Sequence, residues 1–266
     1  MRLNTFTLAS LAGLALMACG QSEPGATEAA PATNEAAAPV ESALPAEGSL
    51  EAAAAGPWRE DAARDVWRNP IETLRFFDVQ ADDTVVEIWP GGGWYTRILG
   101  PYLKSGGGTL YAAGWDLEST NERVIAGLQR YRDNFVNVPE TFGTIIMTEA
   151  TEDSTGMAPD GTVDVVLTFR NVHNWMSGGY AEKMFADAYK ALKPGGVLGV
   201  VEHRLPSTVE QDPQGRTGYV HEDYVIQLAQ EAGFVLEASS EVNANPKDTA
   251  DHPFGVWTLP PNLRSS

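Results

Sequence analysis

The segment from residue 84 to residue 103 constrains the fold more than any other part of the chain. Residues 84–89, Thr-Val-Val-Glu-Ile-Trp, are rich in β-branched and apolar side chains, which predicts a buried strand. A glycine-rich turn follows at 90–93, and residues 94–103 have the pattern of a helix. A strand, a glycine-rich turn and a helix in this order offer backbone N–H groups and a helix N-terminus to a ligand.

The rest of the chain continues this alternation of strands and helices. We expect helices at 121–131, 180–192 and 222–232, and strands at 109–113, 144–147, 163–169, 197–201 and 234–239, with a last strand near 254–259. Such alternation predicts a doubly wound α/β fold, in which a mostly parallel sheet has helices on both faces. Because no helix separates the last two strands, we expect the last one to be antiparallel.

The first residues have the features of an export signal. Residues 1–19 begin with one basic residue, continue with a short apolar run and end in Leu-Met-Ala-Cys, which resembles a bacterial lipobox with Cys19 as the lipidated residue. The alternative is an ordinary secretory signal in which the cysteine is incidental. Gly20 follows the cysteine, and by analogy with bacterial sorting this favours the periplasmic face of the outer membrane.

Composition divides the remainder into a tether and a domain. Residues 20–56 are rich in Ala, Glu and Pro and lack aromatic side chains, so we expect a disordered tether there and a single folded domain at 57–266. The formal net charge of −18 argues against nucleic acid as a partner, since phosphate binding needs a basic surface. Cys19 is the single cysteine, which excludes a disulfide within the fold. We expect contact with the membrane through the lipid anchor only, and the sequence leaves the oligomeric state open.

Two motifs resemble those of class I S-adenosylmethionine-dependent methyltransferases. The first is Glu-Ile-Trp-Pro-Gly-Gly-Gly at 87–93, and the second is Ala-Leu-Lys-Pro-Gly-Gly-Val-Leu at 191–198, with the strand at 164–169 between them. The first motif and the run Asn-Val-His-Asn-Trp at 171–175 look more narrowly like a group of secreted bacterial methyltransferases without an assigned substrate. The resemblance implies a Rossmann-like fold, S-adenosylmethionine as cofactor and a small molecule as substrate.

The resemblance also implies which residues hold the cofactor. The turn would lie against its methionine part, through Glu87, Gly91, Gly92 and Gly93. At the family's usual first glycine this chain has Trp89, and Pro90 follows it without an N–H donor.

Two acidic residues would complete the cofactor site. The family places an acid on the ribose hydroxyls after the second strand, but this chain has Gly114 at that position and Asp116 two residues later. Glu149 matches the acid that meets the adenine amino group. For both Asp116 and Glu149 the alternative is a solvated loop carboxylate.

Polar and aromatic residues follow the expected fourth and fifth strands, where ligands bind in open parallel sheets. We expect His173 and Asn171 to be catalytic, with the imidazole of His173 as a general base. Trp175, His203 and His221 are candidates for binding substrate, although each histidine can equally be an ordinary loop residue. A metal site built from the three histidines lacks a ligand-spacing motif, so we expect no metal.

The methyltransferase hypothesis has competitors of other classes. An exported protein has no evident supply of a cytosolic cofactor, and a fold does not determine a function. The first alternative is a non-catalytic protein that binds a small ligand in the same cleft. The second is an enzyme that uses the scaffold for different chemistry, such as a metal-assisted reaction.

Overall fold

The computed structural model describes residues 5–10 and 44–265, so Cys19 and most of the expected tether lie outside the described residues. The strands are β1 (Thr5–Ser10), β2 (Thr84–Ile88), β3 (Thr109–Gly114), β4 (Thr144–Glu149), β5 (Val163–Phe169), β6 (Leu192–Arg204), β7 (Tyr219–Val220) and β8 (Val235–Ser240). The α-helices are α1 (Leu50–Ala54), α2 (Asp65–Arg68), α3 (Pro70–Phe76), α4 (Thr96–Gly106), α5 (Glu122–Tyr131), α6 (Pro139–Phe142), α7 (Val172–Gly178), α8 (Ala181–Ala191) and α9 (Glu222–Ala232). The other turns are η1 (Ala62–Arg64), the π-helical η2 (Arg132–Val136) and η3 (Gly255–Thr258).

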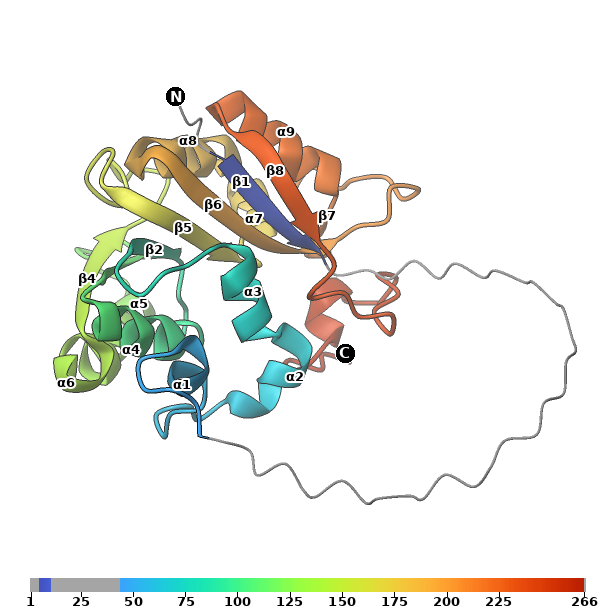
Figure 1. Cartoon of the computed structure of the whole chain (residues 1–266). Helices are drawn as coiled ribbons and strands as arrows, with labels where there is room; N and C mark the ends of the chain where they lie inside the picture. The colour runs from blue at the N-terminus through green and yellow to red at the C-terminus, as the bar shows by residue number, and fades with distance from the viewer. Residues whose placement is uncertain (1–4, 11–43, 266) are drawn as a thin grey trace, which may run out of the picture.

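The sheet has the order β4-β3-β2-β5-β6-β1-β8, with β7 beside the end of β6 (Figure 1). Every pairing among the described strands is parallel. The central strands β2 and β5 are mostly apolar because neighbouring side chains are buried on opposite faces. Val85 packs into one half of the core and Val86 into the other. The expected α/β doubly wound, Rossmann-like architecture is therefore confirmed.

Helices cover the two faces of the sheet in separate layers. The helices α7, α8 and α9 enclose one half of the core, and α1, α3 and α4 enclose the other. In Figure 1, α3 and the segment that follows β8 lie beyond the carboxyl ends of β5, β6 and β8. They are joined there because Asn69 Nδ2 donates to the carbonyl of Val242 at 2.7 Å and Asn243 Nδ2 donates to Thr73 Oγ1 at 3.0 Å.

The expected antiparallel last strand is wrong. Residues 255–258 form the 3₁₀ turn η3, because the chain bends at Gly255, which has a φ of +57°. A side chain there would come within 2.0 Å of the carbonyl oxygen of Thr217, and Val256 N–H donates to that same oxygen at 2.8 Å. The position between β6 and β8 is filled instead by β1, which runs parallel to both.

The N-terminal part of the fold differs from the expected division into leader, tether and domain. The strand β1 lies within the segment expected to be an export signal, and that interpretation of residues 1–19 stays a prediction. The helix α1 lies within the expected tether, yet its residues Leu50, Ala53 and Ala54 are buried against α3 and α4. Its start is capped by Ser49, whose hydroxyl accepts from Ala52 N–H at 3.1 Å. The folded region therefore begins before residue 57. Composition did not indicate this, because the short apolar face of α1 lies in an Ala-rich segment.

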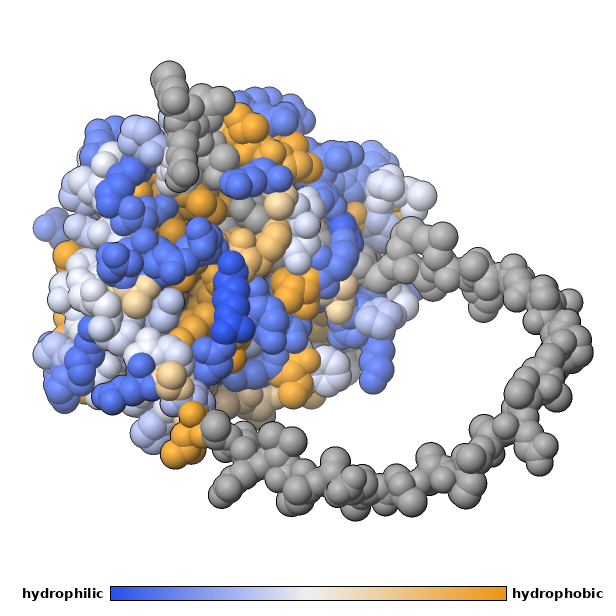
Figure 2. All heavy atoms as spheres, in the orientation of Figure 1, coloured by the Kyte–Doolittle hydropathy of each residue, from blue (hydrophilic) through white to orange (hydrophobic). Residues whose placement is uncertain are grey.

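The outer surface is mixed in polarity. On the face shown in Figure 2, hydrophobic side chains emerge over the middle of the sheet and are flanked by hydrophilic ones. Among the helices of the described segments, none combines the length and the apolar character needed to cross a bilayer.

The place of β1 in the sheet leads to a test on the full chain. Thr7 pairs with Gly199 on one side and Ala238 on the other, so Thr7→Pro removes an N–H from the ladder and adds a ring beside it. We expect urea denaturation to show a loss of about 1–3 kcal/mol in the free energy of unfolding. Thr7→Ala keeps the N–H and is the matched control. Equal stability of the two variants would mean that β1 contributes nothing to the sheet.

Candidate functional site

The carboxyl ends of β2 and β5 form the point at which the chain connections of the sheet diverge. From β2 the chain continues to β3 on one side, whereas β5 pairs with β2 on the other. The buried Asn171 joins these ends, because its Nδ2 donates to the carbonyl of Ile88 at 3.0 Å and to Thr168 Oγ1 at 3.2 Å. Trp89 and Arg170, which follow the strands, both have positive φ values, 51° and 62°. Ligands of open parallel sheets bind beside such a point.

A cavity of about 610 Å³ lies between the turn after β2, the end of β3 and the helix α5. This size is within the range of small-ligand pockets. Its walls are largely aromatic and glycine surfaces, including those of Trp89, Gly91, Gly92, Trp115, Tyr131 and Phe135. Trp115 stacks on Trp89 with ring centroids 4.9 Å apart and keeps half of its surface exposed. An aromatic wall of this kind suits a flat heterocycle.

The glycines of the turn have different roles. Gly91 and Gly92 line the cavity, and a Cβ atom at either would meet no other atom within 4 Å. Gly93 instead faces the protein, because its Cβ would lie 2.3 Å from the ring of Phe135. The expected cofactor contact of Gly93 is thus replaced by a packing role, while Gly91 and Gly92 lie where a ligand would meet the backbone.

Glu87 lies beneath this turn and is only 2% exposed. Thr96 Oγ1 donates to Glu87 Oε2 at 2.7 Å, and the same hydroxyl is 2.9 Å from the hydroxyl of Tyr131, a residue of the cavity wall. Burial raises the pKa of Glu87 to about 7, although the hydrogen bond from Thr96 lowers it in part. Glu87 therefore supports the cavity floor and is itself poised between its neutral and charged forms.

The other two expected cofactor acids serve the loops. Glu149 Oε1 accepts from the N–H of Leu117 at 2.9 Å, which fixes the segment after β3. Asp116 is exposed, and its Oδ1 accepts from Glu118 N–H at 2.8 Å in a local turn. None of the described residues that line the cavity carries a carboxylate. Asp116 and Glu149 each hold a loop through one carboxylate oxygen, and the ribose and adenine contacts expected of them stay predictions.

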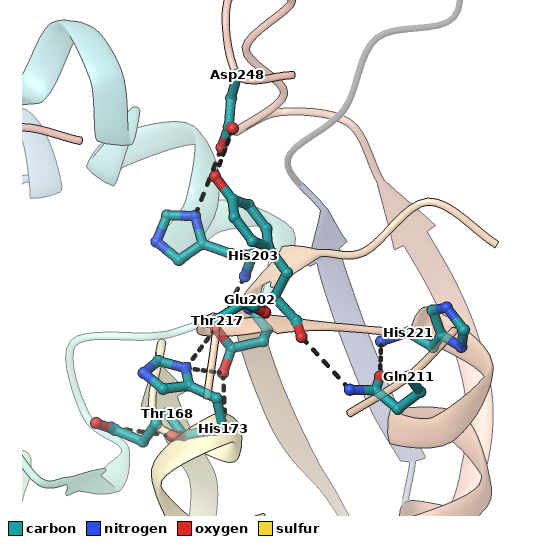
Figure 3. A network of polar contacts seen from close by, with 10 residues as sticks. Thr168, His173, Glu202, His203, Gln211, Thr217, His221 and Asp248 are labelled. Carbon is teal, nitrogen blue, oxygen red and sulfur yellow. Dashed lines mark hydrogen bonds and ion pairs between the residues drawn. The ribbon is translucent and has the colours of Figure 1, made fainter. Parts of the chain in front are cut away.

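His173 forms a buried pair with Glu202, which lies near the carboxyl end of β6 (Figure 3). Its Nδ1 is 3.2 Å from both carboxylate oxygens, and its backbone N–H donates to Oε2 at 3.4 Å. Glu202 also accepts from the N–H of His203 at 2.9 Å. The loop around Gly215 covers His173, since a Cβ there would come within 3.0 Å of the His173 carbonyl.

The pair fixes the tautomer of the imidazole. Burial raises the pKa of Glu202, but the charge and hydrogen bond of His173 outweigh this, so the net pKa is lowered and the carboxyl is ionised. An ionised carboxylate only accepts, so the proton of the neutral imidazole is on Nδ1. Burial lowers the pKa of His173, but the carboxylate raises it more, and the net shift is upward. In this neutral form Nε2, for which no described residue supplies a hydrogen bond, is the basic nitrogen.

A second group of polar side chains lies beside the pair. Tyr219 hydroxyl donates to Asp248 Oδ1 at 2.6 Å, and Asp248 Oδ2 is 3.9 Å from His203 Nδ1 (Figure 3). Asp248 Oδ1 is also 3.2 Å from His252 Nε2. Burial lowers the pKa of His203 to about 4, so this imidazole is neutral at physiological pH. Within the described segments no group of three or more His, Cys, Asp or Glu side chains is arranged to hold a metal ion.

Three of the candidate residues from the sequence have other surroundings than expected. Trp175 is 1% exposed and packs edge-on against Trp89 and Phe185, so it is a core residue and not a substrate contact. His221 lies apart from the pair, and its Nε2 is 2.8 Å from the carbonyl of Val209. Asn171 uses its amide nitrogen to join the strands, so the positioning it provides is of the backbone and not of a substrate.

Several residues of the site escaped the sequence analysis. The sequence carries a signal for Glu202, because an acidic residue at the end of an apolar strand needs a partner when it is buried. It carries no signal for Tyr131 and Phe135, which reach the cavity only through the packing of α5 and η2 on the sheet.

Comparison with known proteins gives matches in structure only. No protein-family model and no curated protein sequence matches the chain. It is similar to a SAM-dependent methyltransferase from Aquifex aeolicus (TM-score 0.46, 17% identity, 65% of this chain and 83% of that one). It is also similar to an S-adenosylmethionine-dependent methyltransferase from Mesorhizobium loti (TM-score 0.43, 18% identity, 63% of this chain and 81% of that one). A third similar structure is an arsenic(III) S-adenosylmethionine methyltransferase from Chlamydomonas reinhardtii (TM-score 0.42, 16% identity, 58% of this chain and 52% of that one). This chain therefore spans about half the length of that protein.

The buried carboxyl of Glu87 predicts a pH-dependent stability. Its folded pKa of about 7 is above the ordinary 4.5, so its contribution is fully present below pH 4.5 and is lost as the pH rises through 7. Glu87→Gln keeps the hydrogen-bond acceptor and removes the titration. Urea denaturation should show that the variant gains about 3 kcal/mol relative to the wild type between pH 5 and pH 8. A difference that is constant with pH would contradict the burial of this carboxyl.

The His173–Glu202 pair predicts a shift that NMR can follow. Because the carboxylate raises the pKa of His173, Glu202→Gln should lower that pKa, as measured from the ring proton shifts. The ring signals of His221, which does not contact Glu202, serve as the internal reference. An unchanged His173 titration would show that the pair does not form in solution.

Proposed function

We propose that this protein binds S-adenosylmethionine in the cavity beside β2 and transfers its methyl group to a small molecule. The observation that carries the proposal is the position of the cavity. It lies where the strand connections diverge, against the exposed backbone of Gly91 and Gly92. A glycine-lined turn after the first strand of such a sheet is the place where the fold brings backbone N–H groups to a nucleotide-like ligand.

The cavity fits the cofactor in some respects. Its volume of about 610 Å³ and the stacked pair Trp89–Trp115 suit an adenosine-containing molecule. The open space at Gly91 and Gly92 allows close backbone approach. When bound, the sulfonium group of the cofactor would supply an activated methyl group. The departure is the lack of a lining carboxylate for the ribose among the described residues.

The chain itself supplies a base for this chemistry. His173, held by Glu202, presents Nε2 as the atom that accepts a proton from the substrate's nucleophile. Asn171 is a positioning residue, since it holds the strand end from which His173 projects. The loop at Gly215 and the edge of Trp257, 5.8 Å from the His173 ring, exclude water from one side.

A second candidate function is a non-catalytic protein that binds a small ligand in the same cavity. It is favoured by the lining, which contains Arg123 and Arg130 but no carboxylate among the described residues. Such a wall suits an adenine compound with negative charge better than a ribose held by an acid.

Export and lipidation complete the proposal. The apolar run and the lipobox-like residues up to Cys19 support an exported protein that is anchored by lipid at the periplasmic face of the outer membrane. Removal of residues before Cys19 would also remove β1 from the sheet.

The decisive test is calorimetric titration of the purified protein with S-adenosylmethionine and S-adenosylhomocysteine. Gly92→Val fills free space in the cavity wall without meeting other atoms, so we expect the fold to survive and the affinity to fall about tenfold or more. Ala126→Val, on the exposed side of α5, is the matched control and should bind as the wild type does.

Absence of binding by the wild type would overturn the methyltransferase proposal and favour the second candidate. A Gly92→Val protein that binds at wild-type strength would place the ligand elsewhere. Once a substrate is found, a His173→Ala protein that methylates it at the wild-type rate would remove the base assignment.

A further inference from the structure

Three arginine side chains, Arg64, Arg68 and Arg170, form a cluster near the carboxyl end of β5, close enough for their charges to act on one another. Arg64 and Arg68 come from η1 and α2, and Arg170 directly follows β5. All three are partly buried. The chain as a whole is acidic, with a formal net charge of −18, so a local group of positive charges is a departure from its overall character.

A chain of aromatic rings holds the cluster together. The guanidinium carbon of Arg68 lies 4.7 Å from the ring centroid of Trp94, and Trp94 packs edge-on against Tyr95 at 4.7 Å. Tyr95 in turn stacks on Phe169 with centroids 3.5 Å apart and planes 9° from parallel. Since Phe169 precedes Arg170, the rings bring α2 and the end of β5 to the same place.

The positive charges of the cluster are not neutralised within the protein. In the part of the chain that the structure describes, no carboxylate forms an ion pair with Arg64, Arg68 or Arg170. The neighbouring acid Asp65 is paired with Arg59 at 2.5 Å. Asp61, whose charge also bears on Arg68, is exposed to solvent.

The groups closest to the arginines do not compensate them either. Burial raises the pKa of Tyr95 to about 12, so its phenol is neutral at physiological pH. Glu202, whose charge acts on Arg170, is held by His173 and by two backbone N–H groups. Burial, followed by the charges of Arg170 and Arg64, lowers the pKa of Arg68 to about 9. Because these like charges repel one another in the free protein, a bound anion would relieve the repulsion.

The backbone of Arg170 points to a role beyond packing. Its φ of +62° is a conformation that costs energy for a residue with a side chain, and it persists because Arg170 N–H donates to the carbonyl of Val201 at 2.7 Å. Strain of this kind gathers at sites where a side chain must be aimed. His173 lies on the same segment, on the helix that begins two residues later.

We propose that Arg64, Arg68 and Arg170 bind an oxyanion, a carboxylate or phosphate, on the molecule that His173 deprotonates. This rests on the proposed function, because it names the chemical class of the acceptor substrate. Guanidinium groups bind both oxyanions through paired hydrogen bonds. An anion held there places the substrate near His173, on which the charge of Arg170 acts.

The test measures anion binding and cofactor binding separately on the full chain. Inorganic phosphate and acetate are titrated at low ionic strength, with the melting temperature and calorimetry as readouts, and S-adenosylhomocysteine is titrated in parallel. We expect Arg68→Gln and Arg170→Gln each to weaken anion binding by about tenfold or more, and Arg170→Lys to weaken it less. Arg75→Gln, on the exposed side of α3, is the matched control and should bind as the wild type does. The stronger of the two anions identifies the substrate group.

Each outcome decides the proposal. Lack of binding of both anions to the wild type, equal loss in Arg75→Gln, or unchanged binding in Arg68→Gln would overturn it. If Arg170→Gln does not fold, Arg68→Gln decides, since it lies on a short surface helix. Phosphate or acetate binding at the cluster without binding of S-adenosylhomocysteine supports the anion site and overturns the methyltransferase proposal. The reverse result overturns the anion site alone.

Discussion

The amide of Asn171 joins the carboxyl ends of β2 and β5, and the candidate site is built on the two segments that leave this junction. Toward β3 the chain runs through Trp89 and the glycine turn to the cavity. Toward β6 it runs through Arg170 to His173, which pairs with Glu202 at the end of the neighbouring strand. A parallel sheet must separate successive strands by crossovers, so its strand ends converge at one edge, and side chains far apart in sequence meet there.

Burial determines the chemistry on both sides of the junction. Two carboxyl groups, Glu87 and Glu202, lie almost completely inside the protein, yet their pKa values are shifted in opposite directions. Glu87 has one hydroxyl as its partner and is favoured as the neutral acid. Glu202 has an imidazole and is favoured as the anion. The difference lies in the charge of the partner and not in the depth of burial.

The pattern of the sequence was sufficient for the scaffold and insufficient for the site. Short runs rich in β-branched and apolar residues located β2 and β5, because central parallel strands are buried on both faces. It misassigned residues 254–259, because a glycine that bends the chain against Thr217 acts through a tertiary contact. Asp116 and Glu149 were matched by position alone, but their hydrogen bonds are to nearby loop N–H groups. Such local hydrogen bonds compete with contacts to a ligand, and the spacing of residues in the sequence does not reveal them.

The strand β1 makes the integrity of the sheet depend on the fate of the N-terminus. In this structure β8 pairs only with β1 among the described strands, and β6 uses β1 on its outer side. Neighbouring strands are about 4.8 Å apart, so a chain without β1 would have two open edges facing each other across roughly 10 Å. An open edge is a template for any extended peptide. If the proposed cleavage before Cys19 takes place, cleavage and completion of the sheet make competing demands on the same six residues.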